Sequence, residues 1–295
     1  MHVSGVFIRC LANRGRGDIV YANMGVRHRY DGTQVTNAPP FRQINPYVMR
    51  GRNESAIYYA QLIDIERTHR YIREYNRGRT HADRLTLFQV LIAATVRVLA
   101  ERPQLNRFVS GRRIYQRNRI QVSFIVKKEL SDDGTETNAK ITFAPDDTLI
   151  TVQKRINEHV AAAKAQSGNS SDREIEIVTK LPRFVLNMIV AGFKALDYFG
   201  IAPSSMIELD PLYTSVYVAN LGSVGLDAPY HHLFEWGNAS IFMVVGRPER
   251  RLIAVGGGRF ETKLAIEIKY TLDDRITEGI YVGRSLTRFR DYIQE

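Results

Sequence analysis

The sequence has one cysteine, Cys10, among its 295 residues, and none of its apolar runs approaches the length of a membrane span. A single thiol cannot form an intramolecular disulfide or a cysteine-rich zinc site. A transmembrane helix needs about 20 consecutive apolar residues. These absences exclude a disulfide-stapled secreted module and a helical membrane protein, and we expect a cytoplasmic protein with no membrane span.

The motifs of several common classes of enzyme are also missing. The sequence has no Gly-x-Ser-x-Gly elbow and no His-Glu-x-x-His zinc motif. Residues 256–258 are three glycines, but no Gly-Lys-Ser/Thr ending follows them, so we predict a hairpin turn and not a phosphate loop. His231 and His232 are the only adjacent histidines and have no third ligand at a suitable spacing, so we expect no metal site.

Lysine is absent from residues 1–80, although the whole chain carries a net charge of +10. Such a charge raises nucleic acid, an anionic membrane surface and a phosphate-bearing cofactor as partners. No helix-turn-helix, zinc-finger or RNA-recognition signature accompanies the arginines. We therefore interpret most of them as solvated surface residues, and nucleic acid as an unlikely partner.

Beyond a leader at residues 1–40, which we expect to be poorly ordered, strands and helices alternate in one domain, residues 41–295. Apolar residues at helical spacing predict helices at 66–75, 85–99, 149–163 and near the C-terminus. Alternating apolar residues predict strands at 57–65, 120–126, 141–143, 213–219, 240–245, 252–255 and 261–271. Turns or loops are predicted at 131–134 and 165–173. This order indicates an α/β two-layer sandwich: a mixed, mostly antiparallel sheet with helices on one face.

Residues 181–200 are unusually apolar, with only Arg183, Lys194 and Asp197 among the aliphatic and aromatic side chains. The uninterrupted apolar stretch is too short to span a bilayer. It could lie at a membrane interface or cover a partner. We favour a helix buried in the core or at a subunit interface, because such apolar runs are usually buried.

Four segments carry a resemblance to a known family. Residues 272–279 read Leu-Asp-Asp-Arg-Ile-Thr-Glu-Gly, and residues 220–223 read Asn-Leu-Gly-Ser. Residues 240–246 form an apolar strand that ends in glycine, and residues 106–115 follow a long predicted helix. In this order they resemble the catalytic domain of the dihydrolipoamide acyltransferases of 2-oxoacid dehydrogenase complexes, and its relative chloramphenicol acetyltransferase. In that family the first segment reads Asp-His-Arg-(Val/Ile)-x-Asp-Gly.

The resemblance implies a CoA-dependent acyltransferase fold and a homotrimer, with each site in a channel between subunits. It also implies CoA or acyl-CoA as a substrate, and no permanently bound cofactor. In the family the histidine takes a proton from the attacking thiol, and a serine or threonine hydroxyl stabilises the oxyanion. Its members also carry lipoyl and subunit-binding domains, for which the roughly 40 residues before the resemblance leave no room.

Carried onto this sequence, the chemical positions are altered and the structural positions are retained. The histidine position is Asp274, and the hydroxyl position, directly before Asn220, is Ala219. The aspartate that pairs with an arginine near the start of the family's domain becomes Glu278, and Arg42 stands at the arginine position. We therefore expect an Arg42–Glu278 ion pair. Turn residues next to the site are Asn220, Gly222, Ser223 and Gly279.

Asp274 is one candidate for the base, because the alternation of the last strand places it on the buried side. A carboxylate with an ordinary pKa of about 3.9 matches a thiol near 8.5 poorly, although burial would raise it. His231 and His232 are the other candidates, as a relocated base.

We expect an acyltransferase-family protein that moves an acyl group between CoA and an unknown acceptor, with its ordinary mechanism impaired. A positioned base is worth about 10²–10⁴-fold in rate, and an oxyanion donor about 10²–10³-fold. The alternative is a non-catalytic trimeric scaffold or acyl-CoA-binding protein, because both chemical groups are replaced.

Overall fold

The structure is a computed structural model, and it describes residues 28–127, 136–165 and 180–295. The first 27 residues of the expected leader, the turn predicted at 131–134 and most of the loop predicted at 165–173 lie outside this range. No helix in the described part is long and apolar enough to cross a membrane.

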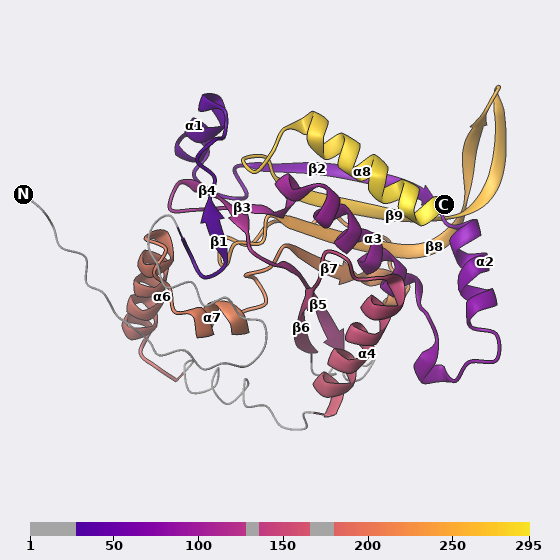
Figure 1. The fold of residues 1–295 in the computed structure, drawn as a ribbon, viewed down its shortest axis with the longest axis horizontal. Helices are drawn as coiled ribbons and strands as arrows, with labels where there is room; N and C mark the ends of the chain where they lie inside the picture. Colours follow the sequence, from indigo (N-terminus) through magenta and orange to yellow (C-terminus); the bar gives the residue numbers. More distant parts are fainter. Residues whose placement is uncertain (1–27, 128–135, 166–179) are drawn as a thin grey trace, which may run out of the picture.

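A six-stranded mixed sheet, in the order β2-β9-β8-β7-β5-β6, forms the centre of the fold (Figure 1). β7 runs parallel to both of its neighbours, and every other pairing is antiparallel. The mixed, mostly antiparallel sheet predicted from the sequence is confirmed. Its strands are β2 (Ala56–Asp64), β5 (Ile120–Lys127), β6 (Glu136–Phe143), β7 (Val216–Asn220), β8 (Ile241–Gly256) and β9 (Arg259–Asp273).

Two strands predicted separately, at 240–245 and 252–255, form the single long strand β8, which contains an irregularity between Val245 and Pro248. β8 and β9 project beyond the sheet as a hairpin (Figure 1). The glycines at 256–258 make the turn of this hairpin, as predicted.

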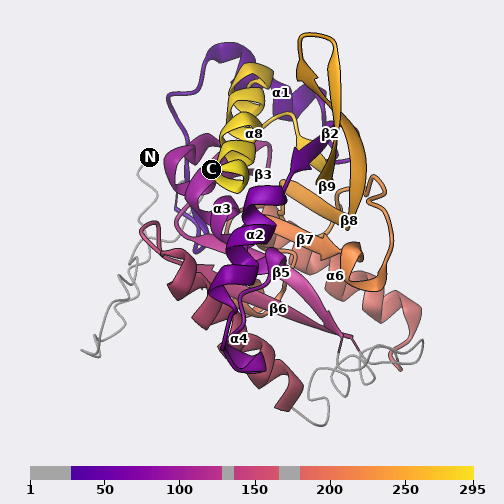
Figure 2. The same cartoon turned by 90° about the vertical axis from the view of Figure 1, so that its right-hand side faces the viewer.

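Helices cover one face of this sheet (Figure 2). Their apolar sides meet the alternate strand residues that point toward them, among them Val218 of β7, Met243 of β8 and Ile268 of β9, all buried. The main core therefore consists of alternate residues of the strands packed against every third or fourth residue of the helices. These helices are α2 (Glu66–Tyr75), α3 (Leu87–Glu101), α4 (Leu149–Ala165) and α8 (Gly279–Gln294).

The ends of α3 follow from local chemistry. Thr86 and Gln89 form a reciprocal capping box at its start: the Gln89 N–H donates to Thr86 Oγ1 at 3.3 Å, and the Thr86 N–H donates to Gln89 Oε1 at 2.9 Å. The helix ends at Glu101, before Pro103, because proline cannot continue the ladder. Pro103 begins the short 3₁₀ turn Pro103–Asn106.

A small antiparallel sheet, in the order β1-β4-β3, lies beside the main one. It consists of β1 (Gly32–Gln34), β4 (Arg113–Arg117) and β3 (Arg107–Ser110), and α1 (Pro40–Val48) follows β1. β1 pairs with β4 from Gly32 opposite Arg117 to Gln34 opposite Tyr115. Residues 28–40 therefore belong to the folded domain, before the boundary that we expected at residue 41.

The apolar segment 181–200 does form a helix, α6 (Arg183–Tyr198), and α7 (Ser204–Leu209) follows it. Of the two settings expected for it, burial in the core of the chain is wrong, since Phe193 is its one buried residue and Phe184 and Met188 are 66% and 69% exposed. A position at a subunit interface stays a prediction. Phe193 packs in a separate small cluster with Tyr213 and Trp236. The helix thus docks on the domain through one side only.

The C-terminal end of α6 is pressed against the β3–β4 turn at Gly111. A Cβ at Gly111 would lie 2.0 Å from the carbonyl oxygen of Tyr198, and the φ of Gly111 is +55°. Only glycine lacks the side-chain atom that both constraints exclude.

We predict that Gly111→Ala destabilises the protein by about 3 kcal/mol or more, because the left-handed backbone costs about 1–2 kcal/mol and the clash with a main-chain atom adds to it. The matched control is Gly78→Ala, since Gly78 has φ +76° but open space around it. This control should lose only about 1–2 kcal/mol. Urea unfolding midpoints measure both, and equal losses would show that α6 does not press on this turn.

Candidate active site

The signature segment 272–279 leaves the sheet at the end of β9 and leads into α8. The Asp273 N–H donates to the Ser240 carbonyl and the Asp274 N–H donates to the Ser55 carbonyl, both at 2.9 Å. Leu272 lies opposite Ile241 of β8, and Asp273 lies opposite Ala56 of β2. Neighbouring chain on both sides therefore holds the segment in place.

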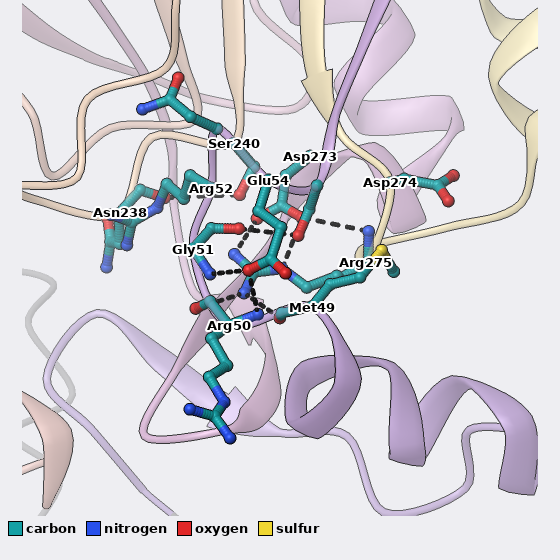
Figure 3. A network of polar contacts seen from close by, with 12 residues as sticks. Met49, Arg50, Gly51, Arg52, Glu54, Asn238, Ser240, Asp273, Asp274 and Arg275 are labelled. Carbon is teal, nitrogen blue, oxygen red and sulfur yellow. Dashed lines mark hydrogen bonds and ion pairs between the residues drawn. The ribbon is translucent and has the colours of Figure 1, made fainter.

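Asp273 and Arg275 form a buried ion pair within the segment (Figure 3). Arg275 Nε donates to Asp273 Oδ1 at 2.8 Å and Nη2 donates to Oδ2 at 2.7 Å, a bidentate arrangement. The two residues are only 1% and 3% exposed. Arg275 Nη1 donates to the carbonyls of Met49 at 3.0 Å and Arg50 at 3.1 Å, so the pair also fixes the chain that follows α1.

Asp274, at the position of the family's histidine, lies between the two members of this pair and is half-buried. Its side chain points away from the Asp273–Arg275 network in Figure 3. Its main chain is well fixed, because Arg42 Nη1 donates to the Asp274 carbonyl at 2.7 Å. Among the described residues, no side chain donates a hydrogen bond to the Asp274 carboxylate. The buried orientation expected from strand alternation belongs to Asp273 instead, because the segment turns after that residue.

The Arg42–Glu278 ion pair expected from the resemblance is not formed in the part of the chain that the structure describes. Glu278 is exposed, and Arg42 binds the main chain of Asp274. Both side chains nevertheless line one cavity of about 260 Å³, together with Gln104, Thr277 and Tyr281. Arg42 therefore braces the signature segment through a carbonyl group, and not through Glu278.

The turn at residues 220–223 follows β7 directly, as the resemblance implies. Ala219 pairs with Val244 of β8, and its methyl group packs in an apolar cluster that includes Tyr217 and Phe242. A Cβ at Gly222 would lie 2.4 Å from the Gly246 carbonyl oxygen, so the close approach of this turn to β8 requires glycine. Ser223 Oγ donates to the Asn220 carbonyl at 2.7 Å, which closes the turn. Gly279, the fourth turn residue, is the first residue of α8.

His231 and His232 lie in the loop before β8 and stack on each other with ring centroids 4.6 Å apart. His231 also stacks on Phe242 at 3.9 Å, in the same cluster region as Ala219. Nδ1 of His231 lies 2.7 Å from the His232 carbonyl, and Nδ1 of His232 lies 2.9 Å from the Leu233 carbonyl. A carbonyl oxygen only accepts, so each Nδ1 is the donor in these contacts. Neither ring contacts Asp274 within the described residues.

Comparisons with known proteins show what this chain is similar to. The family model of the 2-oxoacid dehydrogenases acyltransferase (catalytic domain) matches residues 45–176. Among solved structures, a probable dihydrolipoamide acetyltransferase from Listeria monocytogenes superposes with a TM-score of 0.58 at 14% identity, covering 89% of this chain and 95% of the other. No curated protein matches the sequence.

Two further structures show the same fold. The dihydrolipoamide acetyltransferase of Azotobacter vinelandii, studied for the role of a serine, a histidine and an asparagine in its mechanism, has a TM-score of 0.57 at 14% identity, with coverage of 89% and 93%. A chloramphenicol acetyltransferase has a TM-score of 0.56 at 11% identity, with coverage of 89% and 99%. The chain therefore has the same fold as these acyltransferase catalytic domains. The resemblance stated from the four sequence segments and the expected fold are both confirmed.

The family match covers only part of the chain. Residues 45–176 include β2, α3 and the β3–β4 hairpin. The turn after Ala219 and the segment around Asp274 both lie C-terminal to the match. The family match therefore does not include the positions at which the sequence differs from the quoted family motifs.

Sequence reasoning missed a set of buried arginines, which we had interpreted as surface residues. That interpretation is wrong for Arg29, Arg52, Arg117 and Arg275, which are 2%, 7%, 6% and 3% exposed. Arg117 Nη2 donates to the Asn238 carbonyl and to Asn238 Oδ1, both at 2.7 Å. Two of these arginines, Arg29 and Arg275, stand two residues from an aspartate, and this short spacing between opposite charges could have indicated the pairs.

Arg29 joins three segments of the chain. Its Nε donates to Asp31 at 2.8 Å, and its Nη2 donates to Asp197 of α6 at 2.7 Å. Asp31 also accepts from Asn238 Nδ2 at 2.6 Å. Burial raises the pKa of Asp31, but the Arg29 guanidinium and the hydrogen bonds outweigh burial and hold it below its ordinary value of 3.8.

We predict that Asp31→Asn lowers the free energy of unfolding by about 3 kcal/mol at pH 7, because Arg29 loses a buried partner. The folded pKa of Asp31 is below the unfolded one, so the unfolded state takes up the proton first. The contribution of Asp31 is therefore complete above pH 3.8 and is lost as the pH falls below that value.

Urea titrations between pH 3 and 7 measure the difference between wild type and Asp31→Asn, which should shrink below pH 3.8. The control Asp146→Asn, at an exposed aspartate, should change stability by less than about 0.5 kcal/mol. A difference that stays constant across the whole pH range would contradict the role assigned to Asp31.

Proposed function

We propose that this chain is a CoA-dependent acyltransferase with a rebuilt active site, which moves an acyl group between CoA and an acceptor of unknown identity. The observation that carries the proposal is the intact frame of the signature segment. The Asp273–Arg275 pair and the Arg42 hydrogen bond hold Asp274 at a fixed place between β9 and α8. A fixed main chain at the position of the base is what positional catalysis requires.

The proposed chemistry needs one base. The nucleophilic group of the acceptor attacks the thioester carbonyl, its proton passes to the base, and the thiolate of CoA leaves when the tetrahedral intermediate collapses. Asp274 and His232 are the two candidates, with His231 as the neighbour that stacks on His232. Ala219 supplies no hydroxyl, so an oxyanion would lack one donor, at a cost of about 10²–10³-fold in rate.

We propose a homotrimer, with the site between subunits, and a cytoplasmic location. The face of the sheet opposite the helices carries exposed apolar side chains, including Tyr58 and Leu62 of β2 and Ile125 of β5. Exposed apolar side chains on one face are typical of association surfaces. A related structure is the cubic core of a pyruvate dehydrogenase multienzyme complex, with a TM-score of 0.56 at 14% identity.

We predict that the purified protein, incubated with acetyl-CoA or a longer acyl-CoA and a thiol or amine acceptor, releases free CoA slowly. Chromatography of the CoA species measures the rate. Asp274→Ala or His232→Ala should lower it by about 10²-fold or more, according to which side chain is the base. His69→Ala, at an exposed histidine on α2, is the matched control. Turnover that neither substitution changes would eliminate both residues as the base.

The second candidate function is a non-catalytic trimeric scaffold that binds acyl-CoA. It is supported by the two altered positions, since Ala219 has no hydroxyl and the carboxylate of Asp274 has no orienting partner among the described residues. In this case CoA binds, but no acyl group moves.

The double variant Ala219→Ser with Asp274→His distinguishes the two functions. We predict that it raises kcat/KM for acyl transfer by about 10²-fold or more, because it restores an oxyanion donor and a base of suitable pKa on an existing frame. Single Ala219→Ser and Asp274→His proteins are the controls. CoA binding without transfer, in both the wild type and the double variant, would favour the scaffold.

A further inference from the structure

A cavity of about 380 Å³ lies between α6, the β3–β4 turn and the chain that follows α1. Arg275 of the signature segment reaches its wall, whereas Asp274 does not line it. Figure 3 shows the Asp274 side chain on the other side of the network from Arg50, which does line it. The volume is within the range of small-molecule pockets, about 300–1,000 Å³. This cavity is therefore separate from the surroundings of Asp274.

The walls of the cavity are fixed to one another by buried polar contacts. Asp197 of α6 accepts from Arg29 at 2.7 Å and from Ser110 Oγ at 3.0 Å. The main-chain carbonyl of Asp197 accepts from the same Arg29 at 2.6 Å. The β3–β4 turn also lies directly against the carbonyl of Tyr198 at Gly111, as described above. The walls of the cavity are therefore preorganised by contacts within the protein, and a ligand that binds there does not have to order them.

One arginine in the wall has unused hydrogen-bonding capacity. Arg52 is 7% exposed and lines the cavity, and its Nη1 donates to the Phe234 carbonyl at 3.1 Å. Its Nε is buried without a hydrogen-bond partner. Buried donors of this kind are rare in folded proteins and call for an explanation. Burial lowers the pKa of Arg52, which is the direction expected for a cation that lacks a full set of partners.

Three further cations line the cavity: Arg50, Arg112 and Lys194. All three are exposed, and within the described part of the chain none of them forms an ion pair or donates a side-chain hydrogen bond. Figure 3 shows the Arg50 side chain extended away from the Asp273–Arg275 pair. The charges of Arg50 and Lys194 are therefore available to a ligand, and the Arg112 guanidinium lies over the Tyr47 ring at 5.6 Å with its N–H donors unused in the described structure.

The two carboxylates in the wall do not cancel this charge. Asp197 is held by Arg29 and Ser110. Glu235 accepts from the main-chain N–H of Arg52 at 3.3 Å, the N–H of Asn53 at 3.0 Å and Asn53 Nδ2 at 3.1 Å. Both carboxylates already accept hydrogen bonds from the protein, whereas the exposed cations do not donate any within the described residues. The net charge of the groups that remain for a ligand is therefore positive.

We propose that this cavity binds a small molecule through a phosphate or pyrophosphate group, recognised by Arg50, Arg112, Lys194 and Arg52. A phosphate ester carries close to two negative charges and three terminal oxygens, which a single carboxylate cannot supply. A planar guanidinium binds such oxygens in a bidentate manner. The site does not depend on acyl transfer, because Asp274 takes no part in it.

The only tryptophan of the chain, Trp236, lies in the wall of this cavity and provides a local signal. We predict that inorganic pyrophosphate, titrated at 0.15 M salt, where surface charges are largely screened, changes the Trp236 fluorescence with saturation. The double variant Arg50→Gln with Lys194→Gln should raise the apparent Kd about tenfold or more, because charge-assisted hydrogen bonds to the phosphate oxygens are lost. Both side chains are exposed, so the variant should fold.

The matched control is Arg67→Gln with Arg70→Gln, which removes the same charge from exposed positions on α2. This control should bind pyrophosphate as the wild type does. Equal weakening in the two double variants would show diffuse attraction to a basic protein and would overturn the proposal, as would a wild type whose Trp236 signal does not respond.

Two further titrations test whether the site is independent of Asp274 and whether CoA is the ligand that supplies the phosphate. Asp274→Ala should bind pyrophosphate unchanged, and a loss there would overturn the separation of the two sites. CoA added to the pyrophosphate titration should shift the apparent Kd if CoA supplies the phosphate, and should leave it unchanged if a different ligand does. Both of these results support a phosphate site, whatever the outcome of the acyl-transfer assay.

Discussion

The fold around the signature segment depends on one interaction: the buried guanidinium of Arg275 is satisfied by hydrogen bonds to two separate parts of the chain. Arg275 donates to both oxygens of Asp273 and to the carbonyls of Met49 and Arg50. Because an unpaired buried charge costs several kcal/mol, the end of β9 and the chain after α1 cannot separate without a large loss. Arg275 therefore helps to fix the main chain next to Asp274, and it also fixes the wall of the cavity that Arg50 and Arg52 line.

The main elements of the fold were predictable because period-2 and period-3.6 patterns record which face is buried. α2 and α4 begin at the residues predicted, and the sheet is mixed as expected. α6 shows the limit of such reasoning. Composition predicts how apolar a helix is, but not what covers it, and Phe184 and Met188 remain exposed in this chain. The small sheet was missed because β1 has three residues, too few for a period to show.

The candidate site was predicted mainly from the family resemblance, and only partly from the chemistry and pattern of the residues themselves. The turn at residues 220–223 and the signature segment were placed correctly, since glycine at close approaches and a fixed order of motifs are visible in a sequence. The pairing of Arg42 was not, because the choice between a carboxylate and a carbonyl depends on a turn of the chain after Asp273. Burial of arginine is equally hidden: Arg52 and Arg117 sit in polar segments that carry no apolar pattern.

The buried ion pair is retained and the two other positions differ because substitutions at these positions affect the stability of the fold to different degrees. Removing Asp273 or Arg275 would leave its partner buried and unpaired, at about 3–5 kcal/mol. That is a large part of the stability of a typical domain, about 5–15 kcal/mol. Asp274 is half-buried and its carboxylate supports nothing else in the described structure, so a different side chain there changes stability little. A methyl group at position 219 even adds to an apolar cluster. The packing of the fold thus fixes the position of residue 274 without fixing its identity, so its side chain can change while the surrounding structure stays the same.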